Sequence, residues 1–112
     1  MTYPKRLQKE IKRLARAAHE REMRHYLELL NQKFVEWKNG KFDAWDLAQC
    51  IHEFHNGQAR DLYNSYQSLS PESFLIRAVA AGHIAESELP TEMREEVCRC
   101  SKTLKGEFSW KR

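Results

Sequence analysis

Residues 5–39 contain neither glycine nor proline and carry apolar side chains at helical spacing over almost their whole length. This pattern predicts one long amphipathic helix, because an interior Gly or Pro destabilises a helix by about 1 or about 3 kcal/mol relative to Ala. A helix of about 34 residues is about 50 Å long, whereas a compact domain of this size has a radius of gyration of about 13 Å. We therefore expect one end of the helix to extend beyond the body of the protein.

The glycines and prolines fall between apolar segments, where they mark the ends of further helices. Asn39 and Gly40 form a left-handed cap signal that ends the first helix. Asp43 and Asp46 are spaced for a capping box, which predicts that a second helix begins there. We expect Gly57 to end this second helix near residue 55.

The rest of the chain contains similar signals. A third helix is predicted over residues 58–68, and Ser70 followed by Pro71 begins a fourth. Gly82 ends the fourth helix, and Pro90 opens a fifth. Val, Ile and Thr are sparse and do not alternate as a strand requires. The predicted fold class is therefore all-α: a long N-terminal amphipathic helix followed by about four shorter helices in a small bundle.

The charge of the chain changes sign along its length, although the formal total is only +3. Residues 1–25 carry a net charge of +5, residues 26–99 of −5 and residues 100–112 of +3. We predict a single domain, residues 1–112, with a basic helical arm (1–25) and a bundle (26–104). The basic tail, residues 105–112, is expected either to be disordered or to dock through Phe108 and Trp110.

The apolar stripe of the basic arm predicts an association surface. If Leu7, Ile11 and Leu14 lie on the overhanging end, each forgoes about 1.5–3 kcal/mol of burial. A two-fold homodimer or a helical protein partner would cover them. Trp is enriched at interfaces, so Trp45, which lies off the apolar stripe of its helix, is added to the expected contacts. These are Leu7, Ile11, Leu14, Ala18, Met23 and Trp45.

The basic side chains of the arm form a candidate polyanion-binding surface. Helical rows of this kind can contact phosphates without regard to base sequence. The same charges also suit a solvated helix, an acidic protein partner or the acidic body of this chain, and we favour this solvated or protein-facing interpretation. The candidate residues are Lys5, Lys9, Lys12, Arg13, Arg16 and Arg24.

His52 and His55 are the candidate metal ligands, with Cys50 and Asp61 as conceivable additions. Two histidines three residues apart on a helix can share a metal ion. A histidine at a helix C-terminus is also favoured by the helix dipole, and we favour this second interpretation. We therefore predict no metal and no cofactor.

Arg77 and His83 superficially resemble the Arg and His pair of small all-helical ribonucleases, in which His acts in acid–base chemistry and Arg stabilises phosphate charge. Gly82 interrupts the helix between them, and the residues after Arg77 are apolar. We favour a solvent-facing Arg77 and a His83 that follows a helix cap. No catalytic residue is predicted.

The three cysteines, an odd number, favour a reducing compartment. No apolar run is long enough for a membrane span, and the first residues lack the apolar core of a secretory signal. We therefore expect a cytoplasmic protein without a membrane partner. The leading function is that of a small non-enzymatic regulatory or adaptor protein acting through helix-mediated association. The alternatives are a nucleic-acid-associated regulator that uses the basic helix on phosphates and, third, a helical ribonuclease or metal-dependent enzyme.

Overall fold

The computed structural model describes residues 3–104 and shows an all-α protein, as predicted. The helices are α1 (Lys5–Lys38), α2 (Ala44–Phe54), α3 (Arg60–Ser68), α4 (Pro71–Ala81) and α5 (Thr91–Leu104). A π-helical turn, η1 (His55–Ala59), joins α2 to α3, and a short 3₁₀ helix, η2 (Glu86–Glu88), precedes α5. No residue of the described range lies in a β-strand. None of these helices is long and apolar enough to cross a membrane.

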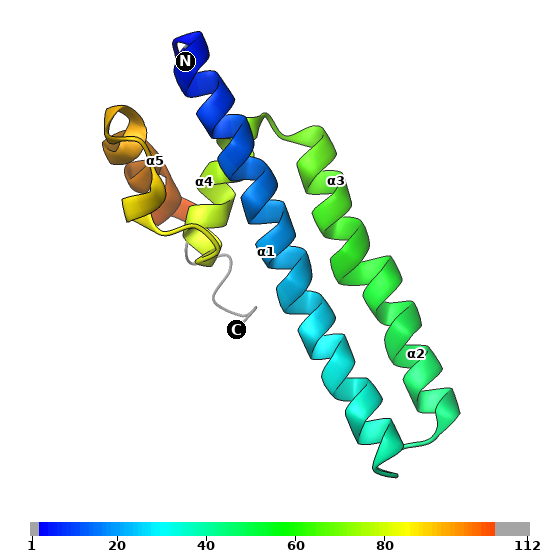
Figure 1. Ribbon diagram of the computed structural model, residues 1–112. Helices are drawn as coiled ribbons and strands as arrows, with labels where there is room; N and C mark the ends of the chain where they lie inside the picture. The colour runs from blue at the N-terminus through cyan, green and yellow to red at the C-terminus, as the bar shows by residue number, and fades with distance from the viewer. Residues whose placement is uncertain (1–2, 105–112) are drawn as a thin grey trace.

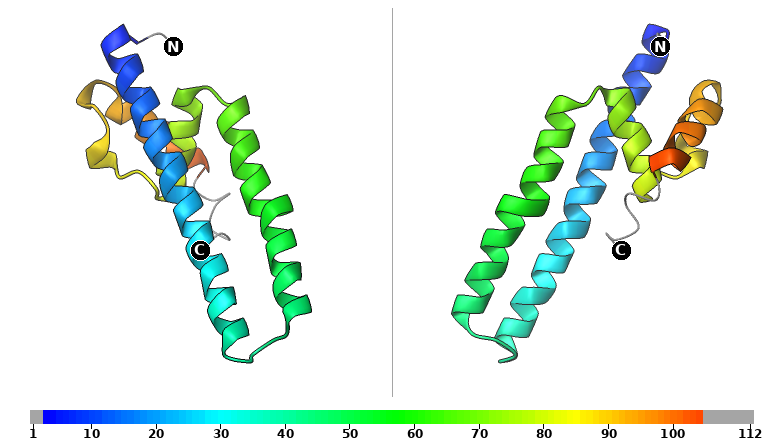
Figure 2. Two further views of the ribbon diagram at one scale, coloured as in Figure 1. Left: turned by 45° about the vertical axis from the view of Figure 1, so that its right-hand side comes forward. Right: turned by 180° about the vertical axis from the view of Figure 1, so that it is seen from behind.

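α1 runs unbroken along the length of the molecule (Figure 1). α2, η1 and α3 form a second rod antiparallel to it, while α4 packs against α1 and α5 packs against α4 (Figure 2). The molecule measures 53 × 22 × 19 Å. Its radius of gyration, 16.6 Å, exceeds the value of about 13 Å for a compact domain of this length. We call residues 27–54, where only α1 and α2 pair, the hairpin end.

Most of the helix ends follow the local sequence signals. Gly40, which follows the C-cap residue Asn39 of α1, has a φ of +78°, as a left-handed cap requires. Asp43 and Asp46 form the reciprocal hydrogen bonds of a capping box at the start of α2. Ser70 caps α4, and Gly82 ends it with a φ of +87°. These predictions are confirmed because each depends only on residues close in sequence.

The second helix, α2, ends at Phe54, close to the predicted residue 55, but the prediction that Gly57 caps it is wrong. Gly57 lacks a positive φ and lies inside η1, so the rod continues over residues 44–68. Leu47 and Tyr66 are 19 positions apart, which would separate them by about 100° around a regular helix. A π turn inserts one extra residue, and this insertion returns both side chains to the face that packs on α1.

The core lies around the N-terminal half of α1, at the other end of the molecule from the hairpin end. Leu7, Ile11 and Leu14 are each 3% exposed or less, so the expected overhang of this segment is wrong. α4 and α5 fold back onto it, and the C-terminal half of α1 extends instead. The core cluster includes Ile11, Leu14, Ala18, Tyr26, Leu62, Phe74, Leu75, Ile84, Met93 and Val97.

The expected boundary between the basic arm and the bundle falls within this core. α1 crosses residue 25 without interruption, and Ile11 and Tyr26 belong to the same core cluster. The predicted basic tail, residues 105–112 with Phe108 and Trp110, lies outside the described residues.

Candidate functional site

A buried ion pair joins the middle of α1 to α4. Arg77 donates two hydrogen bonds to Glu22, with distances of 2.6 Å from Nη1 to Oε1 and 2.9 Å from Nη2 to Oε2. The two side chains are only 9% and 2% exposed. The hydroxyl of Tyr26, one turn further along α1, donates to the same carboxylate over 2.7 Å. Both carboxylate oxygens are therefore bound by side chains of the protein itself.

The surroundings of the ion pair favour its charged form. Burial opposes ionisation of Glu22, but the hydrogen bonds from Arg77 and Tyr26 outweigh it and lower the pKa of Glu22 below its usual value. Burial and the neighbouring carboxylate raise the pKa of Tyr26. The guanidinium of Arg77 also lies over the ring of Phe74, 5.3 Å from its centroid. Arg77 is thus held between a carboxylate and an aromatic face.

Two histidines lie close to this ion pair. Nε2 of His83 is 3.9 Å from Oε1 of Glu22, and the His83 side chain is 18% exposed. The ring of His25 lies 6.1 Å from the ring of His83. The fold therefore brings Arg77 and His83 together around a carboxylate. The expectation of a solvent-facing Arg77 is wrong, because its turn of α4 packs against α1.

Glu22, the carboxylate at the centre of this cluster, is a residue that the sequence analysis missed. It lies four residues after Ala18 and four before Tyr26, in phase with the buried face of α1. A carboxylate at such a position requires a buried cation, and Arg77 follows the buried Phe74 by one turn on α4. The helical phase of Glu22 and Arg77 was the signal that could have identified the pair.

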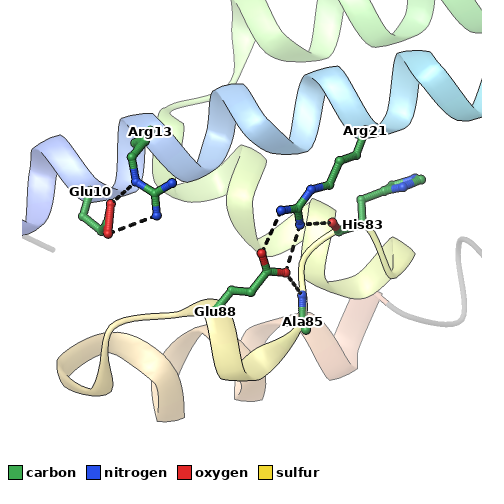
Figure 3. Close-up of polar contacts among 6 residues, drawn as sticks. All are labelled: Glu10, Arg13, Arg21, His83, Ala85 and Glu88. Carbon is green, nitrogen blue, oxygen red and sulfur yellow. Dashed lines mark hydrogen bonds and ion pairs between the residues drawn. The ribbon is translucent and has the colours of Figure 1, made fainter.

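A second set of polar contacts ties α1 to the acidic segment before α5 (Figure 3). Arg21 donates to the backbone oxygen of His83 over 3.0 Å and to Glu88 over 2.9 Å. The backbone N–H of Ala85 donates to the same carboxylate over 2.8 Å. Hydrogen bonds from Arg21 and Ala85 lower the pKa of Glu88. This network fixes the connector between α4 and α5 against α1.

Two contacts with α5 continue the network toward the N-terminus. Arg6 lies 2.9 Å from Glu92, and the hydroxyl of Tyr3 donates to Glu96 over 3.0 Å. Burial and the hydrogen bond to Glu96 raise the pKa of Tyr3 to about 12. The acidic body of the chain therefore pairs with one flank of the basic arm.

The predicted polyanion-binding residues fall into two groups. Arg13 pairs with Glu10, and Arg24 with Glu20, on α1 itself. The other four are exposed, and within residues 3–104 none of them forms an ion pair: Lys5, Lys9, Lys12 and Arg16. The basic charge that remains uncompensated therefore lies on the flank of α1 away from the contacts with α5.

Part of this uncompensated charge borders a groove of about 550 Å³ between α1 and the corner where α3 is followed by α4. Lys9, Lys12 and Arg16 line its α1 side. A smaller recess of about 280 Å³ shares Lys12 and Pro71 with the groove and reaches Tyr3. The fold thus converts part of the predicted polyanion-binding surface into a concave site.

The predicted interface residues are distributed over both ends of the molecule. Leu7 and Ile11 are 3% exposed, and Leu14 and Ala18 1%, because the chain's own helices cover them. The reason for placing these four at a dimer interface is therefore wrong. Met23 is partly buried against the same core. Trp45 is 76% exposed, and its role at an interface stays a prediction.

The hairpin end carries most of the large apolar side chains that the described residues expose. α2 packs against α1 here, and Leu30 and Phe34 of α1 are half-buried. The side chains that remain exposed are Leu27, Leu29, Val35, Trp37, Trp45 and Ile51.

The candidate metal ligands His52 and His55 are both exposed at the junction of α2 and η1. The side-chain amide of Asn56 lies 3.1 Å from Nε2 of His52. Across residues 3–104, no three His, Cys, Asp or Glu side chains are arranged to hold a metal ion, and Cys50 and Asp61 add no such group.

Comparison with known protein families, with curated proteins and with solved structures found no match for this chain. The functional argument therefore rests on the geometry of the chain itself. The Glu22–Arg77 cluster is internal, whereas the hairpin end and the basic-rimmed groove face outward.

Proposed function

We propose that this protein is a small non-enzymatic adaptor that associates through its hairpin end. The observation that carries the proposal is the exposure of Trp45, 76%, together with Leu27 and Ile51, where only two helices pack. Large apolar side chains exposed to solvent are typical of association surfaces, and Trp contributes more binding energy than most residues.

The partner that we propose is a second copy of the chain. A helical hairpin is half of a four-helix bundle, and two hairpins related by a two-fold axis complete one. The hairpin end carries charges of both signs, including Lys33, Lys38, Glu28 and Asp46, and Lys33 pairs with Glu36 within the chain. A self-complementary pairing can therefore place opposite charges together at the rim.

Two further observations support the adaptor proposal and its cytoplasmic location. The guanidinium of Arg77 binds Glu22 instead of facing solvent, where a phosphate substrate would need it. All three cysteines are free thiols, as is common in a reducing compartment.

A nucleic-acid-associated regulator is the second candidate, favoured by the exposed row Lys5, Lys9, Lys12 and Arg16 on one flank of α1. Binding by such a row would weaken steeply with rising salt, because each phosphate contact releases counterions.

Sedimentation equilibrium tests the adaptor proposal. We expect the chain to dimerise with a dissociation constant below about 100 µM. The variant Trp45→Ser/Ile51→Ser should raise this constant about tenfold or more, because it removes apolar side chains from the pairing surface. The matched control is Tyr63→Ser, since Tyr63 is 60% exposed on α3, outside the hairpin end.

A chain that remains monomeric up to about 1 mM would overturn pairing with a second copy. An equal loss of dimer in the Tyr63→Ser control would show that the hairpin end is not the contact surface.

A further inference from the structure

The groove beside α1 combines an apolar floor with a cationic rim. Its floor is formed by Tyr66, Leu69, Pro71 and Phe74, at the corner between α3 and α4. Leu69 is 39% exposed, so the floor is accessible from solvent. A site of this kind matches a ligand that presents apolar and anionic groups on the same side.

The charge of the rim differs from that of the opposite flank of α1. On the α5 side, Arg6 and Arg21 are paired with Glu92 and Glu88. On the groove side, Lys9, Lys12 and Arg16 are exposed and make no ion pair with any described residue. Because the chain's acidic connector already binds the other flank, the groove retains positive charge for an external ligand.

The aromatic groups of the groove are not placed to bind nucleobases. The ring of Tyr66 packs 4.8 Å from His19 and 5.1 Å from Phe74, centroid to centroid. Phe74 is only 1% exposed. Binding of single-stranded nucleic acid depends on open aromatic faces on which bases stack, and these rings already have neighbours.

We propose that this groove binds an acidic amphipathic segment of another protein. Apolar side chains of that segment contact Leu69, Pro71 and Tyr66, while its carboxylates face Lys9, Lys12 and Arg16. Glu72 lines the adjoining recess, so the acidic side chains of the ligand lie toward Arg16. The site is separate from the hairpin end, and an adaptor with both surfaces can join two different molecules.

Fluorescence anisotropy with designed probes tests the proposal. The main probe is a labelled peptide of about 14 residues, or four helical turns, with Leu on one face and Glu beside it. A scrambled peptide of the same composition lacks the apolar face, and a labelled single-stranded oligonucleotide carries phosphate charge with stacking bases. Each is titrated with the full chain at low and at moderate salt.

The amphipathic peptide should bind at least about tenfold more tightly than the scrambled peptide, because only it can fill the apolar floor. The variant Lys12→Glu/Arg16→Glu should weaken its binding about tenfold or more. Leu69→Asp should do the same by removing apolar contact. The matched control is Arg60→Glu/Lys102→Glu, an equal charge change at exposed positions outside both the groove and the hairpin end, and it should leave binding unchanged.

Three results would overturn the proposal. If the scrambled peptide binds as tightly as the amphipathic peptide, charge alone accounts for the binding. Tighter, salt-sensitive binding of the oligonucleotide that depends on Lys12 and Arg16 would make this surface a nucleic-acid interface. If the amphipathic peptide does not bind at about 1 mM, the groove is not a site for acidic amphipathic segments. The Trp45→Ser/Ile51→Ser variant should bind the peptide normally, so failure of either proposal can be recognised separately.

Discussion

Glu22 occupies a position at which the repeat of α1 would otherwise place an apolar side chain. Its carboxylate is held by Arg77 and Tyr26 in a site that is 2% exposed. A buried ion pair of this kind is not itself strong evidence for stability, because desolvation opposes the attraction. The two parallel hydrogen bonds between Arg77 and Glu22 do, however, constrain how α1 can rotate or slide against α4.

Glu22→Gln should destabilise the protein by about 3–5 kcal/mol, because the substitution leaves the buried Arg77 without its counter-charge. Urea denaturation at pH 7 measures this change. The matched control is Glu20→Gln on the same helix: Glu20 pairs with Arg24 at the surface, and its loss should cost at most about 1 kcal/mol. Similar losses in the two variants would contradict the importance of the buried pair.

The same variant has an expected pH dependence. Because the pKa of Glu22 is lowered on folding, its stabilising contribution is present above the unfolded-state pKa of about 4.3. This contribution is lost as the pH falls through the lower folded-state pKa. The difference in unfolding free energy between the wild type and Glu22→Gln should therefore be largest near pH 7 and shrink below about pH 4. A difference that stays constant in acid would contradict this assignment.

At the scale of elements, the rod over residues 44–68 shows how one extra residue can keep a helix in phase. The π turn η1 aligns Leu47 on α2 and Tyr66 on α3 with the same face of α1. Gly57 lies in this turn without a positive φ, whereas Gly82 ends α4 with a φ of +87°. The two glycines therefore have different physical roles.

Substitution of each glycine by alanine should separate these roles. At neither position would an added Cβ meet another atom within 4 Å, so backbone conformation decides the outcome. Gly57→Ala should stabilise the protein by about 0.5–1 kcal/mol, since alanine reduces the entropy of the unfolded chain. Gly82→Ala should destabilise it by about 1–2 kcal/mol, because alanine disfavours the left-handed region. Thermal unfolding compares the two; a stabilising Gly82→Ala would contradict the role of its φ.

At the scale of the whole molecule, α1 is shared by two ends with different packing. Around its N-terminal half, α4 and α5 complete a core that includes Leu14, Phe74 and Met93. At the hairpin end α1 has only α2 as a neighbour, and Leu47 is the buried residue of α2. The two ends should therefore differ in local stability, although one helix runs through both.

Hydrogen exchange followed by mass spectrometry should show this difference. At low micromolar concentration, amides of residues 44–54 should exchange by local opening at least about tenfold faster than those of residues 74–80. Raising the concentration should slow exchange in the hairpin end if a second copy covers it. Equal protection of α2 and α4 in the monomer would contradict the unequal packing of the ends.

Much of this structure follows from local sequence signals. The long first helix, the capping box of Asp43 and Asp46, and the left-handed glycines Gly40 and Gly82 involve residues within a few positions of one another. Their physical causes are the absence of helix breakers and the satisfaction of helix-end hydrogen bonds. The sequence also indicated that one end of α1 would extend beyond the core.

Only the tertiary structure decided which end extends and where the charges are paired. Leu7 and Leu27 both lie on apolar stripes of α1, and nothing in their local sequence shows that α4 and α5 cover the first and not the second. Glu22 and Arg77 are 55 positions apart, so their pairing depends on how two helices pack. The local sequence thus determined the helices and most of their ends, whereas contacts between distant segments determined which faces are buried and which remain open to a partner.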